Sequence, residues 1–197
     1  TVLLTMPGVP FIYYGEEIGM TGGKPDEKIR TPMQWANDAT GGFTTGEPWE
    51  SLNADVKKVN VAAQEADSTS LLSHYRQLIG LRNEHAALRT GAFVPVDSSC
   101  PSTFAYMRHL PASGAETQDS ETVLVIVNFA SKGEQTGCTF SYNGDAIPAG
   151  VYRPTDLLTG ELVTDLTVDA NGFHGYAPSP SLAPRAGYVL LLDRSSG

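Results

Sequence analysis

The chain has 197 residues, of which 41% are hydrophobic, enough for one large domain or for a small domain and part of another. The net charge is -9 and Lys and Arg are not clustered, which argues against nucleic acid and anionic membranes as partners. No apolar run reaches the roughly 18 residues of a membrane-spanning helix. The four histidines and two cysteines lack metal-site spacing, so we expect neither a metal nor a cofactor.

Residues 1–15 are almost wholly apolar, and a Pro-Gly-Val-Pro breaker divides them. The first half, Val2 to Met6, can end a helix. The second half, Val9 to Tyr14, is rich in β-branched and aromatic residues, and it predicts a strand buried on both faces, as in parallel sheets covered by helices. Such a strand needs neighbours, so we expect a partner surface to cover it or the chain to self-associate there. Thr1 follows no initiator Met or signal-like region, which suggests a segment of a longer protein.

A long loop and a helix are predicted next. From Glu16 to Ser68 the sequence is dominated by Gly, Asp, Pro and Thr and contains two Trp residues, a composition that at this length usually builds a site or wraps a surface. One amphipathic helix of about five turns should follow, with Asp67 or Ser68 as its N-cap and Leu88 to Gly91 as its stop.

After Gly91, short strand-like runs alternate with turn residues, the pattern of an antiparallel β-sandwich of roughly a hundred residues. The runs are Ala92–Val96, Thr103–His109, Thr122–Phe129, Gly137–Tyr142, Val151–Pro154, Leu162–Val168 and Gly187–Leu192. The polar, acidic stretch Ser113–Glu121 is expected to be a hairpin loop. The fold class is therefore α+β: the last β/α unit of a (β/α)₈ barrel over residues 1–90, followed by an all-β antiparallel sandwich over residues 91–197.

The two cysteines permit a disulfide without requiring one. Cys100 and Cys138 both lie in strand-like surroundings, so buried free thiols in a cytosolic protein are favoured over an extracellular bridge. A cytoplasmic, bacterial-type location is expected, with an extracellular one as the alternative.

Several motifs, in order along the chain, resemble the α-amylase family of glycoside hydrolases. Gly8–Met20 resembles its eighth barrel strand and the loop that follows, and Arg30-Thr31-Pro32-Met33-Gln34-Trp35 resembles a loop shared by oligo-1,6-glucosidases, α-glucosidases and trehalose synthases. Asn60–Gln64 and Ser70–Ile79 continue the likeness into the eighth helix, and Ala186–Leu192 resembles the last strand of the family's domain C. The short link between Met20 and Arg30 resembles the α-amylases that act on maltooligosaccharides.

The resemblance implies a retaining glycosidase, which needs two carboxyl groups about 5–5.5 Å apart. In the family these groups lie on strands before the eighth, so no catalytic residue is expected here, and the chain alone should be inactive. Glu16 and Glu17 are unsuitable substitutes, because adjacent residues in an extended segment point to opposite sides.

Substrate-binding residues are expected in the long loop. The resemblance implies that Arg30 contacts the sugar, with a structural salt bridge as the alternative. Glu17 could accept a hydrogen bond from a sugar hydroxyl, and Trp35, like Phe43 and Trp49, could either stack on a sugar or anchor the loop.

Three functions therefore compete. The first is the carboxy-terminal part of an α-glucan hydrolase, with an α-glucan oligosaccharide as the partner of the whole enzyme. The second is part of a trehalose synthase-like glucosyl isomerase or transferase, since transfer and hydrolysis differ in how the site handles water and acceptor. The third is a stand-alone carbohydrate-binding sandwich, which the apolar start of the chain opposes.

Overall fold

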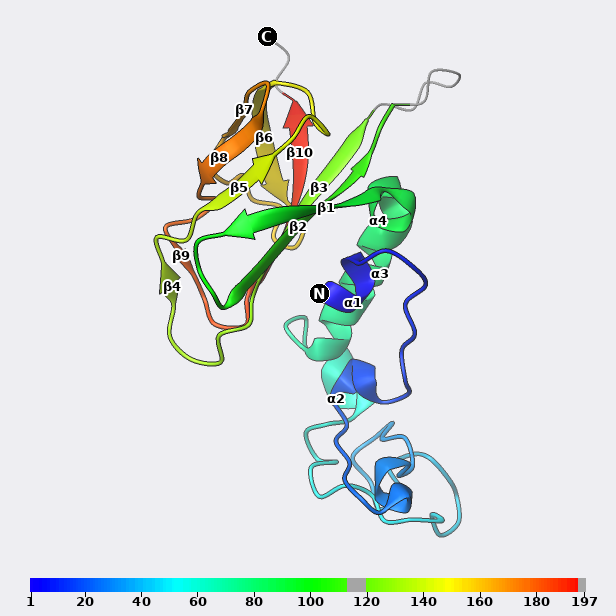
Figure 1. Ribbon diagram of the computed structural model, residues 1–197. Coiled ribbons are helices and arrows are strands. Elements are labelled where there is room, and N and C mark those ends of the chain that lie inside the picture. The colour runs from blue at the N-terminus through cyan, green and yellow to red at the C-terminus, as the bar shows by residue number, and fades with distance from the viewer. Residues whose placement is uncertain (113–119, 195–197) are drawn as a thin grey trace. The chain divides into compact units, whose positions relative to one another are not determined.

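The computed structural model describes residues 1–112 and 120–194 (Figure 1). The chain divides into two compact units, one made of Thr1–Val9 and Leu78–Gly197 and the other of Pro10–Gln77. The predicted division at residues 90 and 91 stays a prediction. None of the helices within the described ranges combines the length and apolar composition that a bilayer crossing demands.

The first unit is built on antiparallel strands. They are β1 (Ala92–Ser98), β2 (Thr103–Leu110), β3 (Glu121–Asn128), β4 (Gln135–Thr136), β5 (Phe140–Asn143), β6 (Gly150–Asp156), β7 (Leu166–Val168), β8 (Gly172–Tyr176), β9 (Ser181–Leu182) and β10 (Gly187–Arg194). Eight of them form one sheet in the order β7-β6-β10-β3-β2-β1-β5-β8, and β4 pairs with β9. The end strands β7 and β8 are in contact, so the sheet curls around one core.

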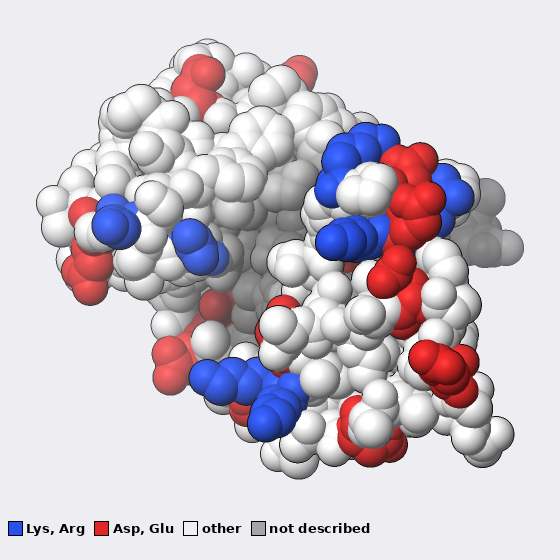
Figure 2. Space-filling view, turned by 90° about the horizontal axis from the view of Figure 1, so that it is seen from below, with Lys and Arg blue, Asp and Glu red and all other residues white. Residues whose placement is uncertain are grey.

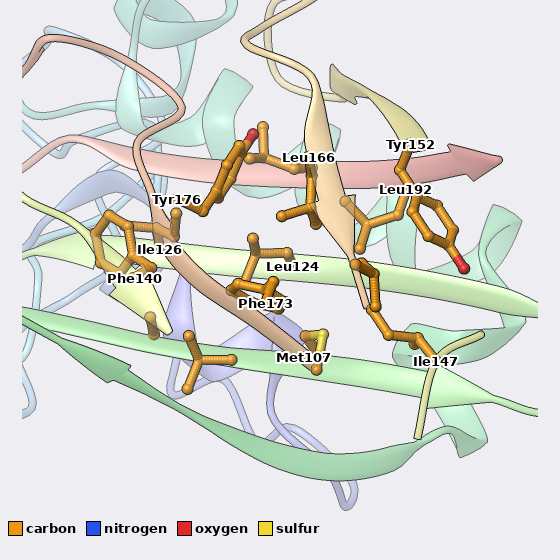
Figure 3. Close-up of a cluster of buried hydrophobic side chains, with 14 of the residues drawn as sticks. Met107, Leu124, Ile126, Phe140, Ile147, Tyr152, Leu166, Phe173, Tyr176 and Leu192 are labelled. Carbon is orange, nitrogen blue, oxygen red and sulfur yellow. The ribbon is translucent and has the colours of Figure 1, made fainter. Parts of the chain in front are cut away.

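The core of this unit lies inside the curled sheet (Figure 3). Leu124 and Ile126 of β3 point into it together with Met107 of β2, as the alternation of side chains along a strand requires. Helix α4 (Ala86–Thr90) contacts β2 and β3, and Val123 and Val125 are also fully buried. Because the core covers one face of β3 and α4 covers the other, both faces are buried and the strand is a continuous apolar run. The predicted all-β sandwich is confirmed.

The prediction of free thiols is wrong, because Cys100 and Cys138 form a disulfide with a Cα–Cα distance of 5.4 Å. Neither cysteine lies in a strand: Cys100 occupies the turn between β1 and β2, and Cys138 precedes β5. Two hydrogen bonds bring these segments together, from Ser99 N to Thr139 O (2.9 Å) and from Thr139 N to Ser99 Oγ (2.8 Å). The connection between β2 and β3 is a hairpin by their pairing, but residues 113–119 of the expected loop lie outside the described residues.

The single helix expected after Ser68 is in fact two helices, α3 (Leu71–Glu84) and α4, separated by His85. Glu121 of β3 stabilises the break, since its carboxylate lies 2.8 Å from His85 Nδ1 and accepts a 2.6 Å bond from Ala87 N. This carboxylate satisfies a free N–H of the first turn of α4. The predicted N-cap is also wrong: Ser70, not Asp67 or Ser68, accepts from Ser73 N (3.2 Å).

The predicted strand from Val9 to Tyr14 does not form. A short helix, α1 (Val2–Thr5), precedes it as expected, but residues 9–13 are irregular, and the side chains of Val9 and Phe11 are 78% and 85% exposed. The physical reason is that a strand exists only as part of a sheet, and no described strand pairs with this segment.

Two buried arginines bind α1 to the rest of the first unit through hydrogen bonds. Arg108 of β2 donates to Thr5 O (2.7 Å), Leu88 O (3.0 Å) and Gly91 O (2.7 Å). Arg82 of α3 donates to the carbonyl groups of Leu4, Met6, Leu88 and Gly8. Burial, and then the neighbouring Arg82 charge, lower the pKa of Arg108. Carbonyl groups at the ends of α1 and α4 compensate both cations, because these ends carry partial negative charge.

On the face in Figure 2, Lys and Arg side chains lie in small groups, several of them beside Asp or Glu.

Candidate functional site

The predicted site residues line one pocket in the second unit, with a volume of about 370 Å³. Its lining residues are Tyr14, Glu17, Arg30, Thr31, Pro32, Met33, Trp35, Phe43 and Trp49. The pocket therefore brings together Glu17, Arg30 and Trp35, which lie in separate parts of the sequence. Apolar walls with a few polar groups are typical of small-molecule sites, which occupy roughly 300–1,000 Å³.

A short 3₁₀ helix, η1 (Glu16–Ile18), positions Glu17. Gly15 before it has φ +82°, and a Cβ there would approach Met20 Sδ to 2.6 Å, so only glycine fits. Ile18 anchors the turn by packing against Met33 and Leu72. Glu16 and Glu17 lie in this 3₁₀ helix and not in the extended segment that was expected. Glu16 accepts from Tyr13 N (3.1 Å), whereas Glu17 lines the pocket and its Oε2 is buried without a hydrogen-bond partner.

Arg30 follows a second 3₁₀ helix, η2 (Asp26–Ile29). Its guanidinium lies 4.0 Å from Asp26 Oδ2, and the two side chains are 65% and 56% exposed. An exposed ion pair at this distance contributes little to stability. Arg30 also acts on Tyr14: burial and Tyr13 raise the pKa of Tyr14, and the Arg30 charge partly opposes them.

Two aromatic residues of the pocket, Trp35 and Phe43, flank a tight turn. Trp35 and Ala36 both donate to Gly41 O (2.7 and 3.0 Å), and the Asp38 carboxylate accepts from the N–H groups of Thr40 and Gly42 (both 2.9 Å). The same N–H groups lower the pKa of Asp38, with Gly42 contributing most. Trp35, Phe43 and Trp49 remain 50%, 48% and 60% exposed, which leaves their ring faces accessible.

Three amide side chains, of which those of Gln34 and Asn60 are buried, hold the long loop in place. Gln34 donates to Val59 O and accepts from Asn53 N (3.1 Å). Asn60 caps α2 (Val61–Glu65) by accepting from Ala63 N (2.8 Å). Gln64 links the two sides of the unit, since it donates to Ile18 O (2.7 Å) and accepts from Leu72 N (3.0 Å). These side-chain hydrogen bonds take the place of the backbone hydrogen bonds that a helix or a sheet would provide.

The sequence analysis quoted these amides within its motifs but gave them no role, and it did not predict α2 as a separate helix, although Asn60 before an apolar run is a recognisable N-cap signal. It also assigned Tyr14 to strand packing, whereas Tyr14 lines the pocket and donates to Thr31 O (3.0 Å). No sequence signal could have shown this, because the error followed from the strand prediction itself. Among the described residues no group of His, Cys, Asp and Glu could hold a metal ion.

Comparison with known proteins identifies the family. The catalytic-domain model of α-amylase matches residues 1–91. An oligo-1,6-glucosidase of Halalkalibacterium halodurans is 36% identical over 165 residues. The chain belongs to the α-amylase family. The family of the sequence-based prediction is confirmed, and so is the fold class, a short helical segment followed by an all-β domain.

The matches cover only part of each relative. The alignment with the oligo-1,6-glucosidase includes 66% of this chain and 28% of the relative. Alpha-amylase 3 of Dictyoglomus thermophilum is 32% identical over 145 residues, 74% of this chain and 27% of the relative. The trehalose synthase/amylase of Mycobacterium tuberculosis is 37% identical over 140 residues, which are 66% of this chain and 22% of the relative. The chain thus spans about a quarter of the length of these relatives.

Solved structures show the same fold. The trehalulose synthase MutB of Pseudomonas mesoacidophila MX-45 superimposes with a TM-score of 0.66 at 28% identity, over 97% of this chain and 36% of the synthase. A protein named as an oligo-1,6-glucosidase and one named as a trehalulose synthase therefore both resemble this chain.

Proposed function

We propose that this chain is the carboxy-terminal part of a retaining glycoside hydrolase that acts on α-glucans or maltooligosaccharides, and that the pocket of Glu17, Arg30 and Trp35 binds the glucan. One observation carries the proposal: the side chains of Arg30 and Glu17 line a pocket whose walls include the exposed aromatic rings of Trp35, Phe43 and Trp49. The homology to an oligo-1,6-glucosidase and to α-amylase 3 supports the choice of substrate class.

The pocket's chemistry suits a pyranose. An aromatic ring packs against the apolar face of a sugar, and the hydroxyl groups at its edge need both donors and acceptors. Arg30 supplies rigid donors, and the Glu17 carboxylate at the pocket wall supplies an acceptor.

The chain's part in catalysis is binding rather than bond cleavage. A retaining mechanism needs one carboxylate as nucleophile and one carboxyl group as acid and base, converging on one glycosidic bond. Glu16 and Glu17 diverge, since Glu16 is engaged by Tyr13 N outside the pocket. We therefore place the reacting carboxylates in the part of the family architecture that the relatives carry beyond the matched segment. The exposed residues from Val9 to Tyr14 would pack there or against a second copy of the chain.

A second candidate is part of a glucosyl isomerase or transferase. The trehalose synthase/amylase relative and the trehalulose synthase structure favour it. Both candidates use the same pocket for the glucosyl group, and they differ in the acceptor that receives it.

Binding to the pocket can be measured directly. Titration of maltotriose into the chain, followed by calorimetry, should show weak binding that Arg30→Ala reduces roughly tenfold, the effect of one or two hydrogen bonds to a charged donor. Trp35→Leu should reduce it roughly fivefold through lost stacking. Lys28→Ala is the control, because Lys28 is an exposed cation of the same loop outside the pocket. Equal affinity of all four proteins would contradict the proposal.

The chain should bind without turnover. Incubated with maltotriose or a nitrophenyl α-glucoside, the purified chain is expected to release no glucose or nitrophenol above a blank. The reason is that a retaining site needs two convergent carboxyl groups, and among the described residues that line the pocket Glu17 is the one carboxylate. Glucose release that Glu17→Gln abolishes would show that the chain holds its own catalytic carboxylate.

A further inference from the structure

Trp49 lies between two hollows of the second unit. It lines the pocket of Arg30 and Trp35, and it also lines a second hollow of about 450 Å³. The other residues of the second hollow are Ala39, Glu47, Pro48, Glu50, Ser51 and Leu52. Among the described residues, Trp49 is the one that lines both hollows, and 60% of its surface is exposed.

The segment that lines the second hollow contacts the segments that line the pocket. Leu52 packs against Gly41, where a Cβ would lie 2.9 Å from Leu52 Cδ2, and Gly41 is the residue that receives the Trp35 N–H. The next residue, Asn53, donates from its backbone to Gln34 Oε1 (3.1 Å) and from its side chain to Thr21 O (2.9 Å). These contacts fix the segment that carries Trp49 to the turn that carries Trp35.

The second hollow is more polar than the pocket, but it too combines an aromatic ring with hydrogen-bonding side chains. It offers the Trp49 ring with Pro48 and Leu52 as apolar surface, and the carboxylates of Glu47 and Glu50 with the Ser51 hydroxyl as polar groups. One Glu50 oxygen accepts from Ser51 N (2.8 Å). Two carboxylates disfavour an anionic ligand, and no metal-binding group occurs in the described part of the chain. Neutral, hydroxyl-rich ligands match the remaining acceptors.

We propose that Trp49 and the hollow of Glu47 to Leu52 form a second sugar-binding subsite, so that one α-glucan oligosaccharide occupies both hollows. The inference rests on the proposed function and extends it to chain length: the site selects oligosaccharides over a disaccharide. Trp49 contributes to both subsites, and Glu47 only to the second.

The test compares maltose with maltohexaose by calorimetry on the full chain. We expect maltohexaose to bind roughly tenfold more tightly, from one further stacking contact and its hydrogen bonds. Glu47→Ala should reduce this ratio about threefold and leave maltose affinity unchanged, since one hydrogen bond is lost. Trp49→Ala should weaken both sugars. Glu27→Ala is the matched control, because Glu27 is an exposed glutamate that lines neither hollow.

The outcomes separate the two proposals. A longer sugar has more ways to bind one subsite, but this statistical advantage is the same in Glu47→Ala, so a change in the ratio reports the second hollow alone. A ratio that Glu47→Ala leaves unchanged overturns the second subsite while maltose binding still depends on Arg30. Maltose binding that is indifferent to Arg30→Ala overturns the proposed function itself.

Discussion

Replacing both Cys100 and Cys138 with alanine is expected to lower the free energy of unfolding of the β-sandwich by about 4 kcal/mol. The disulfide closes a loop with a sequence separation of 38 residues. For a loop of this length, the restriction of the unfolded chain alone gives about 4 kcal/mol at 25 °C. Alanine is the appropriate replacement because Cys138 is only 2% exposed, and a serine hydroxyl would add the cost of a buried polar group.

Urea denaturation followed by far-UV circular dichroism measures the effect, and reductant provides the control. Dithiothreitol should move the unfolding midpoint of the native chain toward that of the double variant, and it should leave the variant itself unchanged. Coincident midpoints of the native and double-variant chains without reductant would show that the bridge does not stabilise the sandwich. The cytoplasmic location inferred from free thiols remains a prediction, but the disulfide removes that support.

The strands that could be predicted from the sequence are those whose side chains alternate or are buried on both faces. β2, β3 and β10 begin or end within two residues of the expected runs, because each lies in the middle of the sheet and must be apolar. β8 was missed. Its sequence, Gly-Phe-His-Gly-Tyr, has two glycines that oppose a strand, but Phe173 and Tyr176 supply the buried contacts that decide the outcome.

The sequence indicated which residues could bind a sugar, but not that these residues lie together in one pocket. Arg30, Glu17 and Trp35 were chosen from motifs, and their meeting in one pocket depends on bonds between residues far apart in sequence. The bond from Gln64 to Ile18 O spans 46 positions, and the bond from Asn53 to Thr21 O spans 32. No local pattern specifies such pairs. The strand at Val9 to Tyr14 failed for a related reason, since its stability depends on neighbours and not on its own composition.

The second large effect is expected at Arg108. Arg108→Met should lower the free energy of unfolding of the first unit by about 3 kcal/mol. Arg108 is fully buried, and its three bonds satisfy the carbonyl groups of Thr5, Leu88 and Gly91. Methionine has a similar length, but it donates no hydrogen bond. Each lost bond from a charged donor destabilises the fold by about 1.5–3 kcal/mol. Methionine also removes the cost of burying a cation, which is several kcal/mol, so the net loss of stability is moderate.

A conservative replacement distinguishes charge from geometry. Arg108→Lys keeps the cation, but one ammonium group cannot reach carbonyl groups that two guanidinium nitrogens now serve, so it should also destabilise, by about 2 kcal/mol. Arg153→Met on the exposed side of β6 is the control and should stay within about 0.5 kcal/mol.

Hydrogen exchange locates the Arg108 effect within the first unit. The bonds from Leu4 N to Thr1 O and from Met6 N to Val2 O report on α1, whose last carbonyl groups Arg108 and Arg82 hold together. We expect these amides to exchange faster in Arg108→Met, and the amides of β6 and β10 to change only as global stability changes. Because α1 leads directly into the segment before Glu17, its release would free that segment at one end. Unchanged exchange at Leu4 and Met6 in a folded Arg108→Met would show that Arg82 alone holds α1 in place.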